Sequence, residues 1–212
     1  MQAVEINTGP NPQACVIWLH GLGADGHDFE PIVPELALAK PVRFVFPHAP
    51  VRPVTINQGM RMRAWYDILQ LGGGPEDEAG IRASQKLLEA MIAEEKKRGM
   101  GAIVLAGFSQ GGAIVLQSAL RHPQRLAGVL ALSTYLPLHA TLEAERSAAN
   151  QDLPIFMAHG QYDDIIPLAR AEQSRTALER LGYRVQWQVY PMPHSVCPEE
   201  IAAISAFLRE VL

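Results

Sequence analysis

Short apolar runs alternate with longer segments of helical period along most of the chain. Runs of this length, bounded by glycine, proline and polar residues, are typical of buried strands. The predicted strands cover residues 15–19, 42–46, 102–106, 127–132, 155–158 and 185–190, with 4–6 as a possible edge strand. The predicted helices cover residues 27–39, 79–98, 112–121, 167–181 and 198–211. This alternation predicts an α/β fold in which a mostly parallel sheet of about seven strands carries helices on both faces.

The segment 47–78 interrupts this alternation, because it has no clear period and contains several prolines and three consecutive glycines. It is far longer than the usual connection of about 4–6 residues, and such segments are often functional. Its strongly apolar cluster, residues 64–69, could line a substrate pocket or hold the segment against the body of the protein. The sequence leaves these two interpretations open.

Composition narrows the class of protein. The 212 residues, 48% of them hydrophobic, suffice for one globular domain over residues 1–212. A net charge of −4 offers no basic field, so nucleic acid is not an expected partner. The chain has no signal-like N-terminus and no apolar stretch near the ~20 residues that span a bilayer, so we expect a cytoplasmic protein without stable membrane insertion. A homodimer is compatible with this composition.

The two cysteines, Cys15 and Cys197, have the spacing of neither a disulfide framework nor a metal site, and we interpret them as packing residues.

Candidate chemistry begins with Gly107-Phe108-Ser109-Gln110-Gly111-Gly112, which joins a predicted strand to a predicted helix. Strand, sharp turn and helix around G-x-S-x-G form a nucleophile elbow, in which a strained turn exposes the serine hydroxyl above the sheet. The pattern alone is also compatible with a glycine-rich turn. Its place between strand and helix favours Ser109 as a nucleophile.

A nucleophilic serine requires a base and an orienting acid, which in this fold follow in the order serine, acid, histidine. His194 lies in the loop after the last predicted strand, at the carboxyl edge of the sheet where the elbow opens. Asp163 and Asp164 follow the strand that ends near His159. The order therefore predicts His194 as the base and one of the two aspartates as the acid, and spacing does not separate them.

The same chemistry requires backbone N–H groups that face the oxyanion. Gln110 directly follows the nucleophile, and Leu22 lies in the glycine-rich loop after the strand 15–19. That loop, residues 21–26, also satisfies G-x-G-x-x-G, the fingerprint of an NAD-binding oxidoreductase. Asp25 would occupy the pyrophosphate position, and no acidic residue for the ribose follows the next strand. We therefore assign the loop to the oxyanion and expect no cofactor and no metal.

Six spaced motifs resemble the bacterial carboxylesterase and acyl-protein thioesterase family of small α/β hydrolases. They are His20-Gly21-Leu22-Gly23, Arg63-Ala64-Trp65-Tyr66-Asp67, residues 107–112, Leu132-Ser133-x-x-Leu136-Pro137, His159-Gly160-x-x-Asp163-x-x-Ile166-Pro167 and Met192-x-His194-Ser195. The resemblance implies that Asp163 is the acid and that no large cap domain is present. It also implies a shallow apolar groove, for which Trp65 and Leu136 are candidates. Ile166 stands where valine is usual, a conservative apolar change.

These observations predict a serine carboxylesterase that hydrolyses carboxylic esters of small to medium acyl chain through an acyl-enzyme intermediate. Its expected partner is a small-molecule ester or acyl substrate. An alternative within the same chemistry is an acyl-protein thioesterase or lysophospholipase that acts on long-chain acyl groups. More remote alternatives are a catalytically silent hydrolase fold that only binds ligands and the NAD-binding oxidoreductase.

Overall fold

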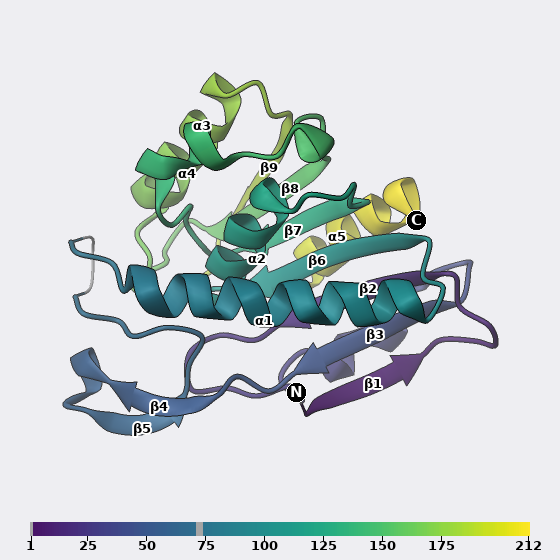
Figure 1. The fold of residues 1–212 in the computed structure, drawn as a ribbon, viewed down its shortest axis with the longest axis horizontal. Helices are drawn as coiled ribbons and strands as arrows, with labels where there is room; N and C mark the ends of the chain where they lie inside the picture. The colour runs from purple at the N-terminus through teal and green to yellow at the C-terminus, as the bar shows by residue number, and fades with distance from the viewer. Residues whose placement is uncertain (1, 71–73) are drawn as a thin grey trace.

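A computed structural model describes residues 2–70 and 74–212. Its centre is a seven-stranded sheet with the strand order β1-β3-β2-β6-β7-β8-β9 (Figure 1). The strands are β1 (Ala3–Asn7), β2 (Ala14–Leu19), β3 (Val42–Pro47), β6 (Ala102–Phe108), β7 (Gly128–Leu132), β8 (Ile155–Gly160) and β9 (Val185–Tyr190). Within this sheet, as far as residues 2–70 and 74–212 show, the pairing of β1 with β3 is antiparallel and the other pairings are parallel. The predicted α/β class and the mostly parallel sheet are confirmed.

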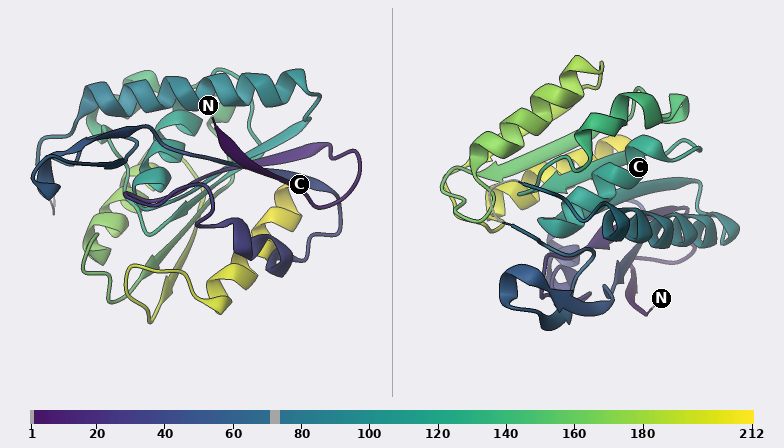
Figure 2. Two further views of the ribbon diagram at one scale, coloured as in Figure 1. Left: turned by 90° about the horizontal axis from the view of Figure 1, so that it is seen from below. Right: turned by 60° about the vertical axis from the view of Figure 1, so that its left-hand side comes forward.

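Helices cover both faces of this sheet. They are α1 (Glu78–Lys97), α2 (Gln110–Arg121), α3 (His139–Glu145), α4 (Leu168–Arg180) and α5 (Pro198–Val211), together with the 3₁₀ helix η1 (Glu30–Leu36). Apolar side chains of α1, α2, α3 and α4 belong to one buried cluster, and those of α5 and η1 belong to a second. Figure 2 (left) shows α1 on one side of the sheet and α5 with η1 on the other. Burial on both faces explains why the central strands are almost entirely apolar.

The segment 27–39 differs from the prediction, because it contains a short 3₁₀ helix in place of a long α-helix. Pro34 lies inside η1, and a proline at this position cannot donate the backbone hydrogen bond that an α-helix requires. Ala37 then ends the turn with a φ of 45°, in the left-handed region.

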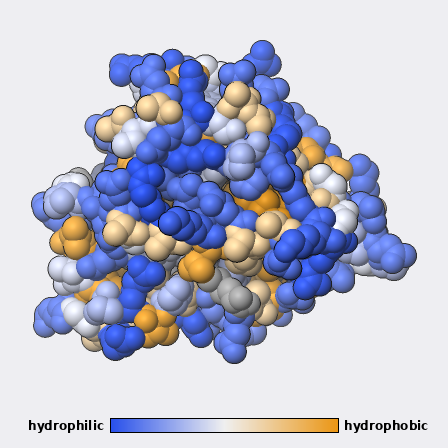
Figure 3. Space-filling view, viewed as in Figure 1, coloured by the Kyte–Doolittle hydropathy of each residue, from blue (hydrophilic) through white to orange (hydrophobic). Residues whose placement is uncertain are grey.

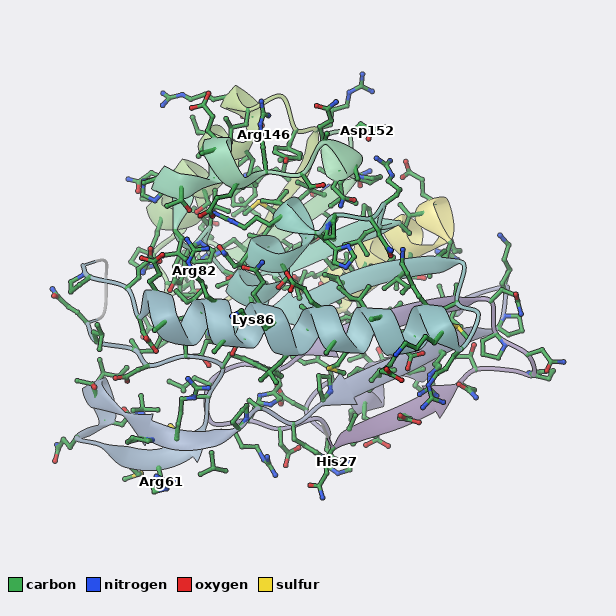
Figure 4. The ribbon with its side chains drawn as sticks, in the orientation of Figure 1. His27, Arg61, Arg82, Lys86, Arg146 and Asp152 are labelled. Carbon is green, nitrogen blue, oxygen red and sulfur yellow. The ribbon has the colours of Figure 1, made fainter. Side chains whose placement is uncertain are left out.

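The long segment 47–78 contains a hairpin that its sequence did not indicate. Its strands, β4 (Val51–Val54) and β5 (Met60–Arg63), pair antiparallel around the short helix η2 (Thr55–Asn57). Strands of four residues that contain Pro53 and three arginines lack an apolar alternation, so no pattern marked them. The hairpin projects at one end of the molecule, and Arg61 is labelled on it in Figure 4.

Helix α3 was also not predicted, since seven residues are too few to establish a helical period. It is held in place by Glu145 at its end. The Glu145 carboxylate accepts hydrogen bonds from Arg82 of α1 at 2.8 Å and from Arg121 of α2 at 2.6 Å. Arg82 projects from α1 on the side that faces α3 (Figure 4). These arginines, Arg82 first, lower the pKa of Glu145 to about 2, so the carboxylate stays charged and joins three helices.

The face shown in Figure 3 is mostly hydrophilic, with hydrophobic residues in smaller patches. Within residues 2–70 and 74–212, every helix is too short or too polar to cross a bilayer.

Candidate active site

Ser109 lies at the sharp turn between β6 and α2. Its φ of 55° and ψ of −119° are unusual for a residue with a side chain, and such strain is typical of a nucleophile elbow. The turn requires a close approach of backbones. A Cβ atom on Gly111 would lie 2.4 Å from the carbonyl oxygen of Leu19, and one on Gly107 would lie 2.5 Å from Gly111. Glycines therefore flank the serine because no larger residue fits.

Three residues that are far apart in the sequence meet at the carboxyl edge of the sheet. His194, in the loop between β9 and α5, places Nε2 2.9 Å from Oγ of Ser109. Its Nδ1 lies 2.7 Å from Oδ2 of Asp163, which follows β8. Because an ionised carboxylate only accepts, Nδ1 carries the proton, and Nε2 is free to accept from the serine hydroxyl. This geometry is that of a nucleophile, a base and an orienting acid.

The two aspartates left open by spacing have different surroundings. Asp163 is buried, and its Oδ1 accepts backbone hydrogen bonds from Ile165 at 3.0 Å and Ile166 at 2.8 Å. Asp164 is exposed. The carboxylate of Asp163 therefore has one oxygen fixed by the backbone and one directed at His194, whereas Asp164 is a turn residue on the surface.

A second histidine, His159, lies beside the Asp163 carboxylate, and the sequence analysis assigned it no role. His159 Nε2 lies 2.8 Å from the carbonyl oxygen of Ile166 and 3.3 Å from Oδ2 of Asp163. Burial lowers the pKa of His159, so the imidazole is neutral and donates from Nε2. His159 is the last residue but one of β8, and a histidine inside an otherwise apolar strand is a signal that could have been followed.

Leu22 and Gln110, the predicted oxyanion donors, both line the pocket that contains Ser109. Gln110 is the first residue of α2, where a backbone N–H has no partner within the helix. Its side chain is engaged elsewhere: Oε1 accepts from the Trp65 amide and Nε2 donates to the Tyr66 carbonyl, both at 2.7 Å. The catalytic roles of both donors stay predictions.

The glycine-rich loop 21–26 is held beside the serine by its neighbours. Gly21 approaches the Ser109 side chain, with 3.5 Å between an added Cβ and that of Ser109. The Gly26 amide donates to Nδ1 of His48 at 3.0 Å. His20 fixes the start of the loop, since its Nδ1 lies 2.7 Å from the Gly21 carbonyl and its Nε2 accepts from the Ala49 amide at 3.0 Å. Burial lowers the pKa of His20 and keeps this acceptor nitrogen unprotonated.

An apolar pocket of about 300 Å³ opens beside Ser109. Residues from the hairpin, the segments 66–70 and 74–77 and the loops after β7 and β8 line it, among them Ile56, Tyr66, Ile68, Leu69, Tyr135 and Ile165. Tyr66 and Ile68 come from the apolar cluster 64–69 that the sequence singled out. Tyr135 had no distinguishing signal, because its place depends on contacts with distant parts of the chain.

The two predicted groove residues lie elsewhere. Trp65 is only 2% exposed and is not among the described residues that line this pocket; its Nε1 donates to the carbonyl of His20 at 2.9 Å. Trp65 therefore holds the segment to the body of the protein, which was the second interpretation of its cluster. Leu136 is buried and lines a neighbouring hollow, which Tyr135 also lines.

Cys15 is buried and Cys197 half-buried, and both are free thiols. The described ranges contain no cluster of three or more side chains suited to hold a metal ion.

The parallel sheet, the strained serine turn and the serine, histidine and aspartate at its carboxyl edge define an α/β hydrolase. The chain belongs to the phospholipase/carboxylesterase family, whose sequence model matches residues 2–212. This membership confirms the resemblance drawn from the motifs, and the protein is a hydrolase.

Individual relatives and solved structures agree with this family. An acyl-protein thioesterase 1 of Gibberella zeae is 42% identical over 94% of this chain and 91% of its own. One of Neurospora crassa is 41% identical over 94% of this chain and 87% of its own. The crystal structure of Arabidopsis thaliana SOBER1 matches with a TM-score of 0.88 and 29% identity, over 93% of this chain and 98% of that one. Acyl-protein thioesterase 2 of Zea mays matches with a TM-score of 0.87 and 27% identity over 99% of both chains.

A buried carboxyl group near the active-site loop predicts how stability depends on pH. Glu200, at the start of α5, is 0% exposed, and neither carboxyl oxygen has a hydrogen-bond partner among the described residues. Burial raises the pKa of Glu200 to about 8. The folded state therefore holds this proton more tightly than the unfolded chain, so the free energy of unfolding should fall as the pH rises from about 4.5 to 8, by on the order of 1–4 kcal/mol.

Glu200→Gln removes this titration and should raise the free energy of unfolding at pH 8 while flattening its decline between pH 5 and 8. Urea denaturation at several pH values measures both quantities. Glu199→Gln, at the exposed neighbouring position, is the matched control and should keep the wild-type slope. An unchanged slope in Glu200→Gln would assign the pH dependence to other groups.

Proposed function

We propose that this protein hydrolyses acyl thioesters, with S-acylated protein as the substrate class, and that it cleaves oxygen esters by the same steps. The observation that carries the proposal is the hydrogen-bonded series Ser109, His194 and Asp163 opening into an apolar pocket. The sequence favoured carboxylic esters of small to medium chain, with acyl-protein thioesterase as the alternative. Relatives named acyl-protein thioesterase support the alternative better than the first prediction.

In the proposed reaction, Nε2 of His194 takes the hydroxyl proton of Ser109 as Oγ attacks the acyl carbonyl carbon. The Asp163 carboxylate stabilises the imidazolium, and the N–H groups of Leu22 and Gln110 stabilise the oxyanion. The imidazolium then gives its proton to the departing thiolate or alkoxide, which leaves an acyl ester on the serine. Water, deprotonated by the same imidazole, attacks this ester and releases the carboxylic acid.

The pocket supports an acyl substrate with an alkyl chain. Among the described residues that line it, isoleucine, leucine and tyrosine supply eight side chains, and each buried methylene group favours binding by about 0.8 kcal/mol. The leaving group departs when the tetrahedral intermediate collapses to the acyl-enzyme. A thiolate leaves without strong protonation, so thioester cleavage places the smaller demand on His194 as an acid.

Matched substrates that differ only in sulfur or oxygen test this proposal. We expect kcat/KM for an S-octanoyl cysteine peptide to exceed that of the O-octanoyl serine peptide of the same sequence by at least about tenfold. Release of the free thiol and of octanoic acid measures the two rates. Turnover of the oxygen ester alone would instead indicate a carboxylesterase. A kcat/KM for release of fatty acid from lysophosphatidylcholine that is higher than for either peptide would indicate a lysophospholipase.

A further inference from the structure

Two hollows share one wall on the side of the molecule where α4 lies. The first is the apolar pocket that contains Ser109, with a volume of about 300 Å³. The second, of about 650 Å³, is lined largely by α4 and has a more polar lining, which includes His139 and Glu172. Tyr135, Arg170, Glu76 and Gly74 line both hollows. The side chains of Tyr135, Arg170 and Glu76 therefore stand between the pocket beside the serine and the larger hollow.

Polar groups that are paired with one another form part of this shared wall. The hydroxyl groups of Tyr66 and Tyr135 are 2.8 Å apart, and the Arg170 guanidinium carbon lies 3.4 Å from the centroid of the Tyr135 ring. Burial raises the pKa of both tyrosines, so both phenols are neutral and satisfy each other as donor and acceptor. The guanidinium over the ring is a cation–π contact. An alkyl chain that pushed into this wall would remove these polar groups from their partners without replacing them.

Hydrogen bonds on both sides hold the wall in place. Thr134 donates from Oγ1 to the carbonyl of Ser109 at 2.7 Å, so the residue before Tyr135 is tied to the serine turn. The amide of Leu136 donates to Oγ of Ser174 at 2.9 Å, and that hydroxyl donates to the carbonyl of Arg170 at 2.9 Å. Both neighbours of Tyr135 are thus fixed, one to the serine turn and one to α4.

We propose that Tyr135 and Arg170 form the end wall of the acyl pocket and set the longest acyl chain that the enzyme uses efficiently. The inference rests on the proposed function, since it takes the pocket beside Ser109 as the acyl site. A methylene group is about as large as a water molecule, whose share of volume is about 30 Å³, so about 300 Å³ accepts on the order of ten carbons. Up to that length each added methylene should raise kcat/KM by about fourfold, and beyond it the gain should stop.

Arg170→Ala tests the wall, because it opens the passage into the second hollow. Arg170 is half-buried on α4 and alanine favours helix, so the variant should fold. The matched control is Arg175→Ala, on the same helix, whose guanidinium lies 5.3 Å from the centroid of the Trp187 ring and which does not line either hollow among the described residues. The measurement is kcat/KM for p-nitrophenyl esters with acyl chains from two to sixteen carbons.

In the wild type and in Arg175→Ala, we expect the rise of kcat/KM with each added methylene to stop near ten carbons. In Arg170→Ala, the rise should continue for about four further carbons. The palmitoyl-to-decanoyl ratio of kcat/KM should therefore be at least tenfold higher in Arg170→Ala than in the wild type. If kcat/KM of Arg170→Ala stopped rising at the same chain length as in the wild type, Arg170 would not form the end wall of the pocket. Arg170→Met, which keeps the length of the side chain, should raise the ratio less than Arg170→Ala; an equal rise would overturn a steric wall. Wild-type protein without turnover at any length would instead overturn the proposed function itself.

Discussion

Replacement of Ser109 with alanine is expected to lower kcat for acyl thioesters and oxygen esters by about 10⁴- to 10⁶-fold. The substitution removes the atom that forms the acyl-enzyme, and His194 then has no hydroxyl from which to accept a proton. The substitution leaves the proposed oxyanion donors and the pocket untouched, so a residual acceleration over water on the order of 10³–10⁴ should persist. Steady-state turnover of a p-nitrophenyl ester and labelling by a fluorophosphonate measure the effect.

The variant should keep its fold. Ser109 has a φ of 55°, and alanine carries the same Cβ atom, so the backbone strain of the turn does not increase. The backbone contacts of the turn, including the Ser109 amide to the Leu132 carbonyl at 2.9 Å, do not involve the hydroxyl. A thermal melt within a few degrees of the wild type would show this.

Ser133→Ala is a suitable control for the loss of a hydroxyl at this edge. Ser133 is also buried with a positive φ of 45°, and it follows the neighbouring strand β7. Its Oγ has no hydrogen-bond partner among the described residues. Activity within about threefold of the wild type is expected there. If Ser109→Ala retained comparable activity and Ser133→Ala did not, Ser109 would not be the nucleophile.

The parts of the fold that the sequence predicted are those in which local pattern and tertiary structure agree. Strand β2 is buried at every position, so its continuous apolar run predicted a buried strand. Helix α5 begins at Pro198, and proline is favoured in the first turn of a helix. The serine turn could be found because strand, glycines and helix are adjacent in sequence. His194 could be found because parallel strands bring their carboxyl ends to one edge.

The parts that could not be predicted depend on contacts between distant segments. Tyr66 and Tyr135 face each other across 69 residues, and neither residue type nor spacing indicates that their hydroxyls meet. Trp65 lies one position before Tyr66, yet the segment is turned so that Trp65 packs inward while Tyr66 lines the pocket. Gln110 fixes this orientation by hydrogen bonds to both residues. A side-chain amide that acts through two backbone groups 45 and 44 residues away leaves no local pattern.

Sequence spacing does not distinguish Asp163 from Asp164, and the structure allows an experiment that does. Asp163→Asn should lower kcat/KM by about 10⁴-fold, whereas Asp164→Asn should leave it within about threefold of the wild type. The two substitutions make the same chemical change at adjacent positions, one buried beside His194 and one exposed. General effects of the substitution on solubility or local charge are therefore controlled.

The large effect of Asp163→Asn follows from the way the backbone would orient the new amide. Ile165 and Ile166 donate N–H groups to Oδ1 of Asp163, so the amide oxygen must occupy that position and the NH₂ group must face His194. Nδ1 would then accept, and the proton would move to Nε2. That tautomer donates toward Ser109 and cannot take the serine proton.

A pH-rate profile separates this cause from a simple loss of charge. Hydroxide can take the serine proton in place of the imidazole at high pH, so activity of Asp163→Asn should rise again above about pH 9. Fluorophosphonate labelling of Ser109 in the variant should slow in parallel with turnover and recover over the same pH range. Equal losses in Asp163→Asn and Asp164→Asn, or a loss in Asp164→Asn alone, would show that the carboxylate 2.7 Å from Nδ1 is not the group that orients His194.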